Sequence, residues 1–383
     1  EVVTALAAAD WKPPFHPDPP TLTWVAVDPQ LVERQAEAAA SEAVRLVTQV
    51  VESCGRRPIR RRKDGVIGSR EVKRLAKESK ADEADVAQAL DLALIGALLM
   101  TADDDPSSAL RPGPAFEAWL RQSPGGRALA LARLWWVTPQ AVRTSDGVCP
   151  PPCRDCAPFV AAVRKAVLEL LREGSLELAA PAAPAMPEQV GAVMAWRMPL
   201  AVDHLAGSAR PPLEMDPLAP TLATENLIGI AGVVEATATA TLAEAAWLGL
   251  VSAGALCAAG SALLRDDRAA LESALGSLGE LQATARVQAD LTAVVMGMPE
   301  PGLTRTLDLL ADREASGAAT SWRFGPASVR RGFDAGLDQD EILSRLRGLA
   351  DGPLPQALEY LVADVARRHG QVRVGEASCY LVA

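Results

Sequence analysis

Apolar residues recur at helical spacing over much of the chain, between stretches rich in proline and glycine. A proline-rich stretch covers residues 11–23, and Asp28-Pro29 then opens a pattern that predicts a long helix to about Ser53. Asp28 suits the N-cap, and Pro29 suits the first helical position, where no backbone N–H is needed. We expect Gly55 to stop this helix.

Two shorter helices follow, over residues 69–78 and 82–98, with a connection of three or four residues. An apolar, strand-like run at residues 98–100 and a polar Asp-Pro-Ser loop come next. A tight helix pair followed by a strand is typical of a winged helix, whose core is a helix-turn-helix. We therefore interpret this part of the chain as a winged-helix-like unit.

Helical patterns continue through the middle of the chain. They cover residues 116–140, where Trp135 and Trp136 are candidates for the core and not for base stacking, and residues 159–173. An Ala- and Pro-rich loop is expected over residues 179–187.

Residues 225–264 have the pattern of a second helical hairpin that ends in a short wing, with Gly254 and Gly260 as turn points. Within it, residues 245–264 carry no charge, and their length alone would allow a membrane span. Glycine, serine and alanine make up most of this stretch, and they favour hydrocarbon only weakly. We therefore expect a buried helix followed by a tight turn.

The last hundred residues mix short strands and helices. The patterns predict strands at 287–297 and 320–324, helices at 304–315, 326–335, 338–349 and 354–369, and a hairpin at 372–382. A helix followed by a hairpin is the back half of a winged helix.

These elements predict a mainly α (α+β) protein, with tandem winged-helix-like units followed by a small α+β domain. A length of 383 residues favours two or three domains. We expect the end of a cut helix and a proline-rich linker over 1–27, and a winged-helix-like domain over 28–125. A helical region with a second winged-helix-like unit should cover 126–266, and the α+β domain 267–383.

Charge is distributed unevenly along the chain. The whole sequence has a net charge of −10, but residues 56–80 hold eleven Lys and Arg against three Asp and Glu, a net charge of +8. We call residues 56–80 the basic segment. Such a patch can attract phosphates. The candidate DNA-binding residues are Arg56, Arg57, Arg60, Arg61, Arg62, Lys63, Arg70, Lys73, Arg74 and Lys77, with Lys80 at the end of the same helix.

Two other interpretations of the basic segment remain open. It can be a solvated surface, or it can bind an acidic protein partner. Sequence-specific DNA readout is disfavoured, because the second helix of the pair carries Asp82, Glu83 and Asp85, no Lys or Arg, and only Gln88 suits base recognition. We expect non-specific contacts to the phosphate backbone of DNA, with a winged-helix, sequence-specific transcription regulator as the alternative.

No catalytic residues are predicted. The sequence has no Gly-Lys-Ser/Thr phosphate loop, so we expect no ATP hydrolysis. The letters Asp-Glu-Ala-Asp at 82–85 spell a helicase motif, but they fall at a helix start, where acidic residues favour the helix dipole. No nucleophile, base or carboxylate pair stands out, so we expect a protein that is not an enzyme and needs no cofactor.

Six cysteines are too few for a disulfide scaffold in a chain of this length. Cys149, Cys153 and Cys156 have spacing that invites a zinc site, but zinc needs four ligands, and His204 is the nearest plausible fourth. We expect free thiols and little or no tightly bound zinc. With no signal peptide in view, the expected location is cytoplasmic and nucleoid-associated, with no membrane contact.

One resemblance covers about residues 280–383. The segments that carry it, in order, are Val-Gln-Ala-Asp-Leu-Thr (287–292), Trp322-Arg323-Phe324, Ser328-Val329, Ala335-Gly336-Leu337, Ile342, Leu354-Pro355-Gln356, 369–374 and Cys379-Tyr380-Leu381-Val382. This series resembles the N-terminal domain of the XPB/Ssl2 helicases, also described as a helicase-conserved C-terminal-type domain in actinobacterial proteins. One departure is Ala289, where that family often has proline.

The upstream part, from Trp11 on, resembles the body of long actinobacterial helicase-associated proteins. This resemblance lies in the general character and order of its segments and not in specific motifs. In the XPB/Ssl2 family this domain is not the motor but docks protein partners in DNA repair and transcription. The resemblance therefore implies a non-catalytic adaptor, with an XPB-type helicase or a nuclease as the partner, and it supplies no catalytic residues.

Overall fold

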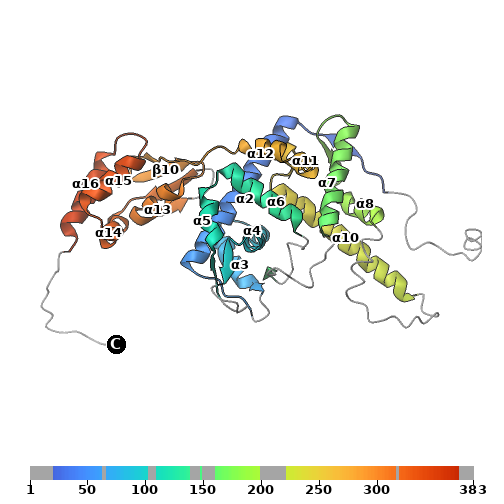
Figure 1. Ribbon diagram of the computed structural model, residues 1–383, viewed down its shortest axis with the longest axis horizontal. Coiled ribbons are helices and arrows are strands. Elements are labelled where there is room, and N and C mark those ends of the chain that lie inside the picture. The colour runs from blue at the N-terminus through green and yellow to red at the C-terminus, as the bar shows by residue number, and fades with distance from the viewer. Residues whose placement is uncertain are drawn as a thin grey trace, which may run out of the picture. The chain divides into compact units, whose positions relative to one another are not determined.

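The computed structural model describes residues 20–62, 66–101, 109–138, 147–148, 160–198, 221–315 and 319–370. The chain forms two compact units, which we call unit 1 (1–279) and unit 2 (280–383) (Figure 1). Over the described residues there are fourteen helices and only small antiparallel sheets. The predicted class, mainly α with some β, is therefore confirmed. The domain boundaries predicted at residues 27, 125 and 266 stay predictions.

Helix α2 (Pro29–Arg56) is the central helix of unit 1 and packs against α4, α6 and α10. Asp28 caps it as predicted, because its Oδ1 accepts a hydrogen bond from the Gln30 N–H at 2.9 Å. The helix does not stop at Gly55. A Cβ at Gly55 would lie 3.2 Å from Cγ of Pro112, so the glycine allows close packing, and the helix ends at Arg56.

The basic segment leads from α2 into the predicted helix pair. Helices α3 (Ser69–Ser79) and α4 (Glu83–Ile95) pack on α2, and strands β3 (Leu99–Thr101) and β4 (Leu110–Pro112) form an antiparallel hairpin after them. Ile59 bridges to Leu110, which places the extended residues after α2 beside β4. Strand β2 (Ile67–Gly68) pairs with β5 (Gly147–Val148).

The single helix predicted over 116–140 is wrong. The structure has α5 (Pro114–Arg121) and α6 (Pro124–Val137), separated by extended residues. Ser123 caps α6 by accepting the Gly126 N–H at 3.1 Å. The buried Arg127 donates to the carbonyl of Leu120, which the end of α5 leaves without a helical partner.

The predicted loop over 179–187 contains a strand. Helix α7 (Val160–Glu177) is followed by β6 (Ala182–Pro184), which pairs with β1 (Trp24–Ala26), and by α8 (Gln189–Arg197). Strand β1 comes directly after the proline-rich stretch.

The helical hairpin expected over 225–264 is also wrong. One long helix, α10 (Thr221–Trp247), is followed by the two-residue strands β7 (Val251–Ser252) and β8 (Ala255–Leu256), and then by α11 (Ala258–Leu264) and α12 (Arg268–Gly276). Gly254 is a turn residue as expected, but Gly260 lies inside α11. Among the helices in the described residues, none has the length and apolar character needed to cross a bilayer.

A buried ionic network joins three helices of unit 1. The side chains of Arg164 (α7) and Glu244 (α10) are 0% and 3% exposed, and they pair at 3.1 Å. The indole N–H of Trp135 (α6) donates to the same Glu244 carboxylate at 2.6 Å, and Arg164 donates to the Trp135 carbonyl at 2.6 Å. The Arg164 guanidinium also lies 4.9 Å from the Trp135 ring centroid. Trp135 is thus a core residue, as predicted.

Over its described residues, unit 2 contains a four-stranded antiparallel sheet, in the order β11-β12-β10-β9, and four helices. The helix predicted over 304–315 is too long, because residues 312–315 form a strand that pairs with β12. The predicted hairpin at 372–382 lies outside the described residues. The elements are β9 (Arg286–Val287), β10 (Thr292–Met296), α13 (Pro301–Leu310), β11 (Asp312–Ala315), β12 (Ala319–Arg323), α14 (Pro326–Asp334), α15 (Gln339–Leu349) and α16 (Gln356–Arg368).

Trp322 on β12 is part of the core of unit 2. Its side chain is 0% exposed and packs in one cluster with Ala293 and Val295 of β10 and with apolar residues of the helices. Its indole N–H donates to Asp308 of α13 at 2.7 Å, so the sheet and α13 are joined by a hydrogen bond as well as by packing.

Candidate nucleic-acid interface

The structure distributes the predicted DNA-binding residues over three elements. Arg56 ends α2, and Arg57, Arg60, Arg61 and Arg62 lie in the extended residues that follow. Arg70, Lys73, Arg74 and Lys77 lie on α3, and Lys80 is its C-cap. Lys63 lies outside the described residues. Because Ile59 is tied to β4, the extended residues are held beside the β3–β4 hairpin.

Four cations of helix α3 and its C-cap lie on the exposed side of the helix. Its buried face carries Val72, Leu75, Ala76 and Ser79. Arg70, Lys73, Lys77 and Lys80 are all exposed, and they follow one another at intervals of three, four and three residues. This spacing places them along one strip of the helix surface, which we call the cationic stripe. Within the part of the chain that the structure describes, none of the four forms an ion pair.

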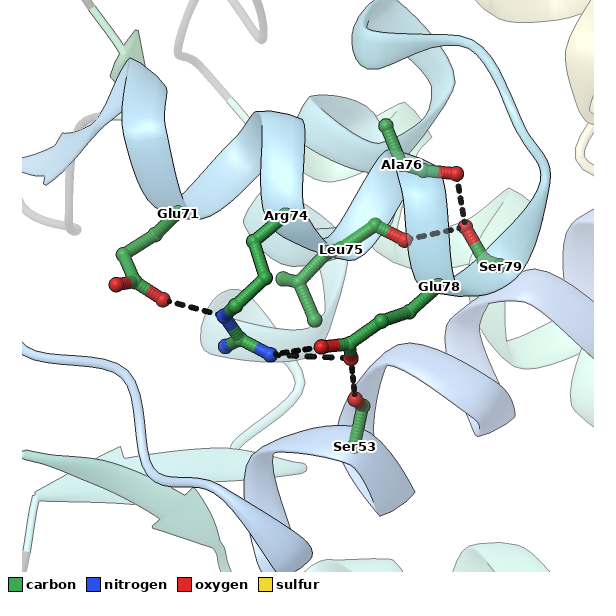
Figure 2. Close-up of polar contacts among 7 residues, drawn as sticks. All are labelled: Ser53, Glu71, Arg74, Leu75, Ala76, Glu78 and Ser79. Atoms are coloured by element: carbon green, nitrogen blue, oxygen red, sulfur yellow. Dashed lines mark hydrogen bonds and ion pairs between the residues drawn. The ribbon is translucent and has the colours of Figure 1, made fainter.

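Arg74 lies on the same helix, but its guanidinium is paired with the carboxylates of Glu71 and Glu78 (Figure 2). Its Nε is 2.9 Å from Glu71 and its Nη1 is 2.8 Å from Glu78, and its side chain is only 13% exposed. Glu78 in turn accepts a hydrogen bond from Ser53 on α2. Glu78 therefore links α3 to α2 through its hydrogen bond with Ser53, and the charge of Arg74 is compensated by two carboxylates of its own helix.

The contact with α2 changes the acidity of Glu78. Partial burial alone would raise its pKa, but the hydrogen bonds from Ser53 and Arg74 outweigh burial, so the pKa of Glu78 is lowered. A carboxylate whose pKa is lower in the folded state stabilises the fold above its unfolded pKa. That contribution is lost as the pH falls through the folded pKa.

We expect Ser53→Ala to raise the pKa of Glu78, because the hydrogen bond that favours its charged form is removed. The variant should also lose less stability than the wild type on acidification from pH 6 to pH 3. Carboxyl chemical shifts followed through a pH titration measure the change, with Glu341 on α15 as the internal control. If the pKa of Glu78 is the same in the variant, the hydrogen bond from Ser53 does not stabilise the charged carboxylate.

Helix α4 offers little surface to a DNA groove. Asp82 stands at its N-cap, so the sequence Asp-Glu-Ala-Asp falls at a helix start as predicted. From Val86 to Ala93 nearly every side chain is buried. Gln88, which suited base recognition by type, is 0% exposed and donates to the carbonyl of Glu244 at 3.3 Å.

Sequence reasoning missed one basic residue beside the basic segment. Arg111 on β4 is exposed and lies opposite Met100 of β3. Only the pairing of Ile59 with Leu110 brings it next to residues 57–60. The one local signal is its position between Leu110 and Pro112 in an extended run, which predicts an outward side chain.

Metal binding is not supported by any group of residues in the described ranges, where no three His, Cys, Asp or Glu side chains gather. Cys149, Cys153, Cys156 and His204 lie outside those ranges. Cys54 and Cys257 are buried free thiols. Burial raises the pKa of Cys54 to about 12 and also raises that of Cys257, which keeps both thiols protonated and unreactive.

Comparison with known families finds one match. Residues 286–383 match the family model described as "Helicase conserved C-terminal domain". No curated protein matches this chain. The match lies in unit 2, whereas the basic segment lies in unit 1. It fits a helicase-associated protein and does not single out the N-terminal domain of the XPB/Ssl2 helicases.

Proposed function

We propose that this chain is a non-catalytic, helicase-associated adaptor that binds the phosphate backbone of DNA through the cationic stripe and the extended residues before it. The observation that carries the proposal is the division of charge on α3. Arg74 is compensated by two carboxylates, while Arg70, Lys73, Lys77 and Lys80 face solvent. In a chain of net charge −10, exposed cations on one strip form a local positive potential that attracts phosphates.

The order of elements also supports nucleic-acid binding. Helix α2, the bridging Ile59, helices α3 and α4 and the β3–β4 hairpin follow one another in the order of a winged helix. The proposed DNA contact differs from that of most winged helices, in which the second helix of the pair enters the major groove. It uses α3 and the residues before it, because α4 is buried and acidic at its start.

The burial of Gln88 favours non-specific phosphate contacts over a sequence-specific transcription regulator. The helicase-type match in unit 2 supports the helicase-associated part of the proposal. Unit 2 would dock a protein partner, as the resemblance to the XPB/Ssl2 N-terminal domain implies. An XPB-type helicase or a nuclease acting in DNA repair or transcription is the proposed partner, in a nucleoid-associated location.

We expect Lys73→Ala/Lys77→Ala to weaken DNA binding about 60-fold at 0.1 M salt if each lysine contacts one phosphate. The slope of log affinity against log salt should flatten by about 1.8 for duplex DNA, since each phosphate contact contributes about 0.9. Two unrelated duplex sequences should be affected equally. Fluorescence anisotropy at several salt concentrations measures both quantities.

The matched control is Arg133→Ala/Arg172→Ala, which removes two exposed cations of unit 1 outside the basic segment. It changes the net charge by the same amount and should leave the slope unchanged. Unchanged binding by the lysine variant would exclude the stripe as a DNA contact, and an acidic protein partner would then be the better explanation. Equal losses in both variants would show that only the overall charge matters.

A further inference from the structure

The outer face of the β3–β4 hairpin combines a cation with an exposed apolar side chain. Met100 and Arg111 are direct cross-strand partners, and both point away from the core, because their neighbours Leu99 and Leu110 are buried. Met100 is 46% exposed, although it belongs to a paired strand. The two side chains therefore form one small surface, apolar on β3 and positive on β4.

The extended residues of the basic segment continue this surface. The N–H of Leu110 donates to the Ile59 carbonyl at 2.8 Å, and the N–H of Ile59 donates to the Leu110 carbonyl at 3.3 Å. In this antiparallel register Arg60 is the diagonal neighbour of Arg111 on the same face, about 7–8 Å away. We call Arg60, Arg111 and Met100 the hairpin face.

The hairpin is held firmly at its base. The N–H of Gly113 donates to the Leu98 carbonyl at 2.8 Å. A Cβ at Gly113 would lie 2.5 Å from the Ala97 carbonyl oxygen, so only glycine allows this close approach. Pro112 packs against Gly55 at the end of α2. The hairpin face is thus fixed relative to the start of the basic segment.

We propose that the hairpin face binds unpaired bases of a polynucleotide, either in a single strand or at the open end of a duplex. The inference rests on the proposed function, since it assigns a second contact to the same nucleic acid. Contacts to a duplex backbone are made by cations and other hydrogen-bond donors, whereas Met100 offers a polarizable apolar surface. Unpaired bases expose flat, apolar faces, against which a guanidinium plane stacks and a thioether packs.

The two surfaces suit different parts of a nucleic acid. The cationic stripe on α3 consists of a guanidinium and three ammonium groups, which suit phosphates without regard to pairing. The hairpin face adds two guanidinium groups and an apolar side chain, which suit a base. A nucleic acid with both paired and unpaired parts would satisfy both surfaces at once.

The test compares Met100→Ala and Arg111→Lys with Lys73→Ala/Lys77→Ala. Arg111→Lys is informative because it keeps the charge and removes the planar group that stacks. Each protein is titrated with a mixed-sequence single strand, a blunt duplex and a forked duplex that ends in two single-stranded arms. Circular dichroism melting curves check that the exposed substitutions leave the fold intact.

We expect Met100→Ala and Arg111→Lys each to weaken binding to the single strand and the fork by about fivefold or more, and binding to the blunt duplex by less than twofold. Lys73→Ala/Lys77→Ala should weaken all three complexes. If the two hairpin variants bind the single strand as well as the wild type while the lysine variant weakens every complex, the inference is wrong and the proposed function stands.

Equal losses on the single strand and the blunt duplex would also overturn the inference, because the face would then not distinguish unpaired bases. If the wild type binds none of the three nucleic acids, the proposed function itself fails. The basic segment and the hairpin face would then both be assigned to a protein partner.

Discussion

Replacing Arg164 by methionine should lower the free energy of unfolding of unit 1 by about 3–5 kcal/mol. The substitution leaves the Glu244 carboxylate buried without its cation, in a site where both side chains are almost fully excluded from solvent. Burial lowers the pKa of Arg164, and the nearby Glu244 opposes that shift, so each charge is tolerated mainly because the other is present. Glu244→Gln should be destabilising for the reciprocal reason.

The double variant Arg164→Met/Glu244→Leu should be more stable than either single variant. It removes both buried charges, and well-packed apolar residues often replace a buried ion pair with little loss. Some deficit should remain, because the Trp135 indole N–H and the carbonyls of Trp135 and Thr138 lose their partners.

Urea unfolding followed by far-ultraviolet circular dichroism measures these differences, with Trp fluorescence as a second probe. Arg268→Met is the matched control, since Arg268 forms an ion pair with Glu272 on the surface and should leave the unfolding midpoint unchanged. A double variant that is less stable than both single variants would contradict the expected coupling between the two charges.

The second large effect is expected in unit 2. Trp322→Ala should cost about 3–5 kcal/mol, because it removes a fully buried indole and leaves a cavity between the sheet and the helices. Asp308 also loses the indole N–H that it accepts at 2.7 Å. Trp322→Phe should cost less, because most of the apolar volume is kept and only the hydrogen bond and part of the ring are lost.

The control for Trp322 is Tyr360→Ala on α16, which is 66% exposed and should change stability by no more than about 0.5 kcal/mol. Amide hydrogen exchange read out on peptides from both units shows where protection is lost. We expect faster exchange in unit 2 and unchanged exchange in unit 1. A Trp322→Ala protein as stable as the Tyr360 variant would show that this core tolerates the cavity.

Several helices could be predicted from the sequence because their signals are local. Asp28 and Pro29 start α2 as predicted. Asp338 and Glu341 form a reciprocal capping box at the start of α15, where the predicted helix begins within a residue of the observed one. Capping and helical periodicity act over three or four residues, so the chain carries these signals whatever the rest of the fold does.

Elements that depend on distant partners could not be predicted in the same way. The end of the helix predicted over 304–315 is a strand because β12 pairs with it. Strand β6 forms in a predicted loop because β1, more than 150 residues earlier, lies beside it. The break between α5 and α6 had a local signal in Ser123-Pro124, which the long apolar pattern obscured.

In the candidate site, too, some features follow from the sequence and others only from the tertiary structure. The sequence by itself determined that residues 56–80 are strongly basic and that α3 has an apolar face. Only the tertiary structure decided which of those cations face solvent, because Ser53 on α2 holds Glu78, and Glu78 compensates Arg74. It also buried Gln88 and brought Arg111 beside Arg60. Charge is a property of the residue, but exposure and partnership depend on which distant segments pack against it.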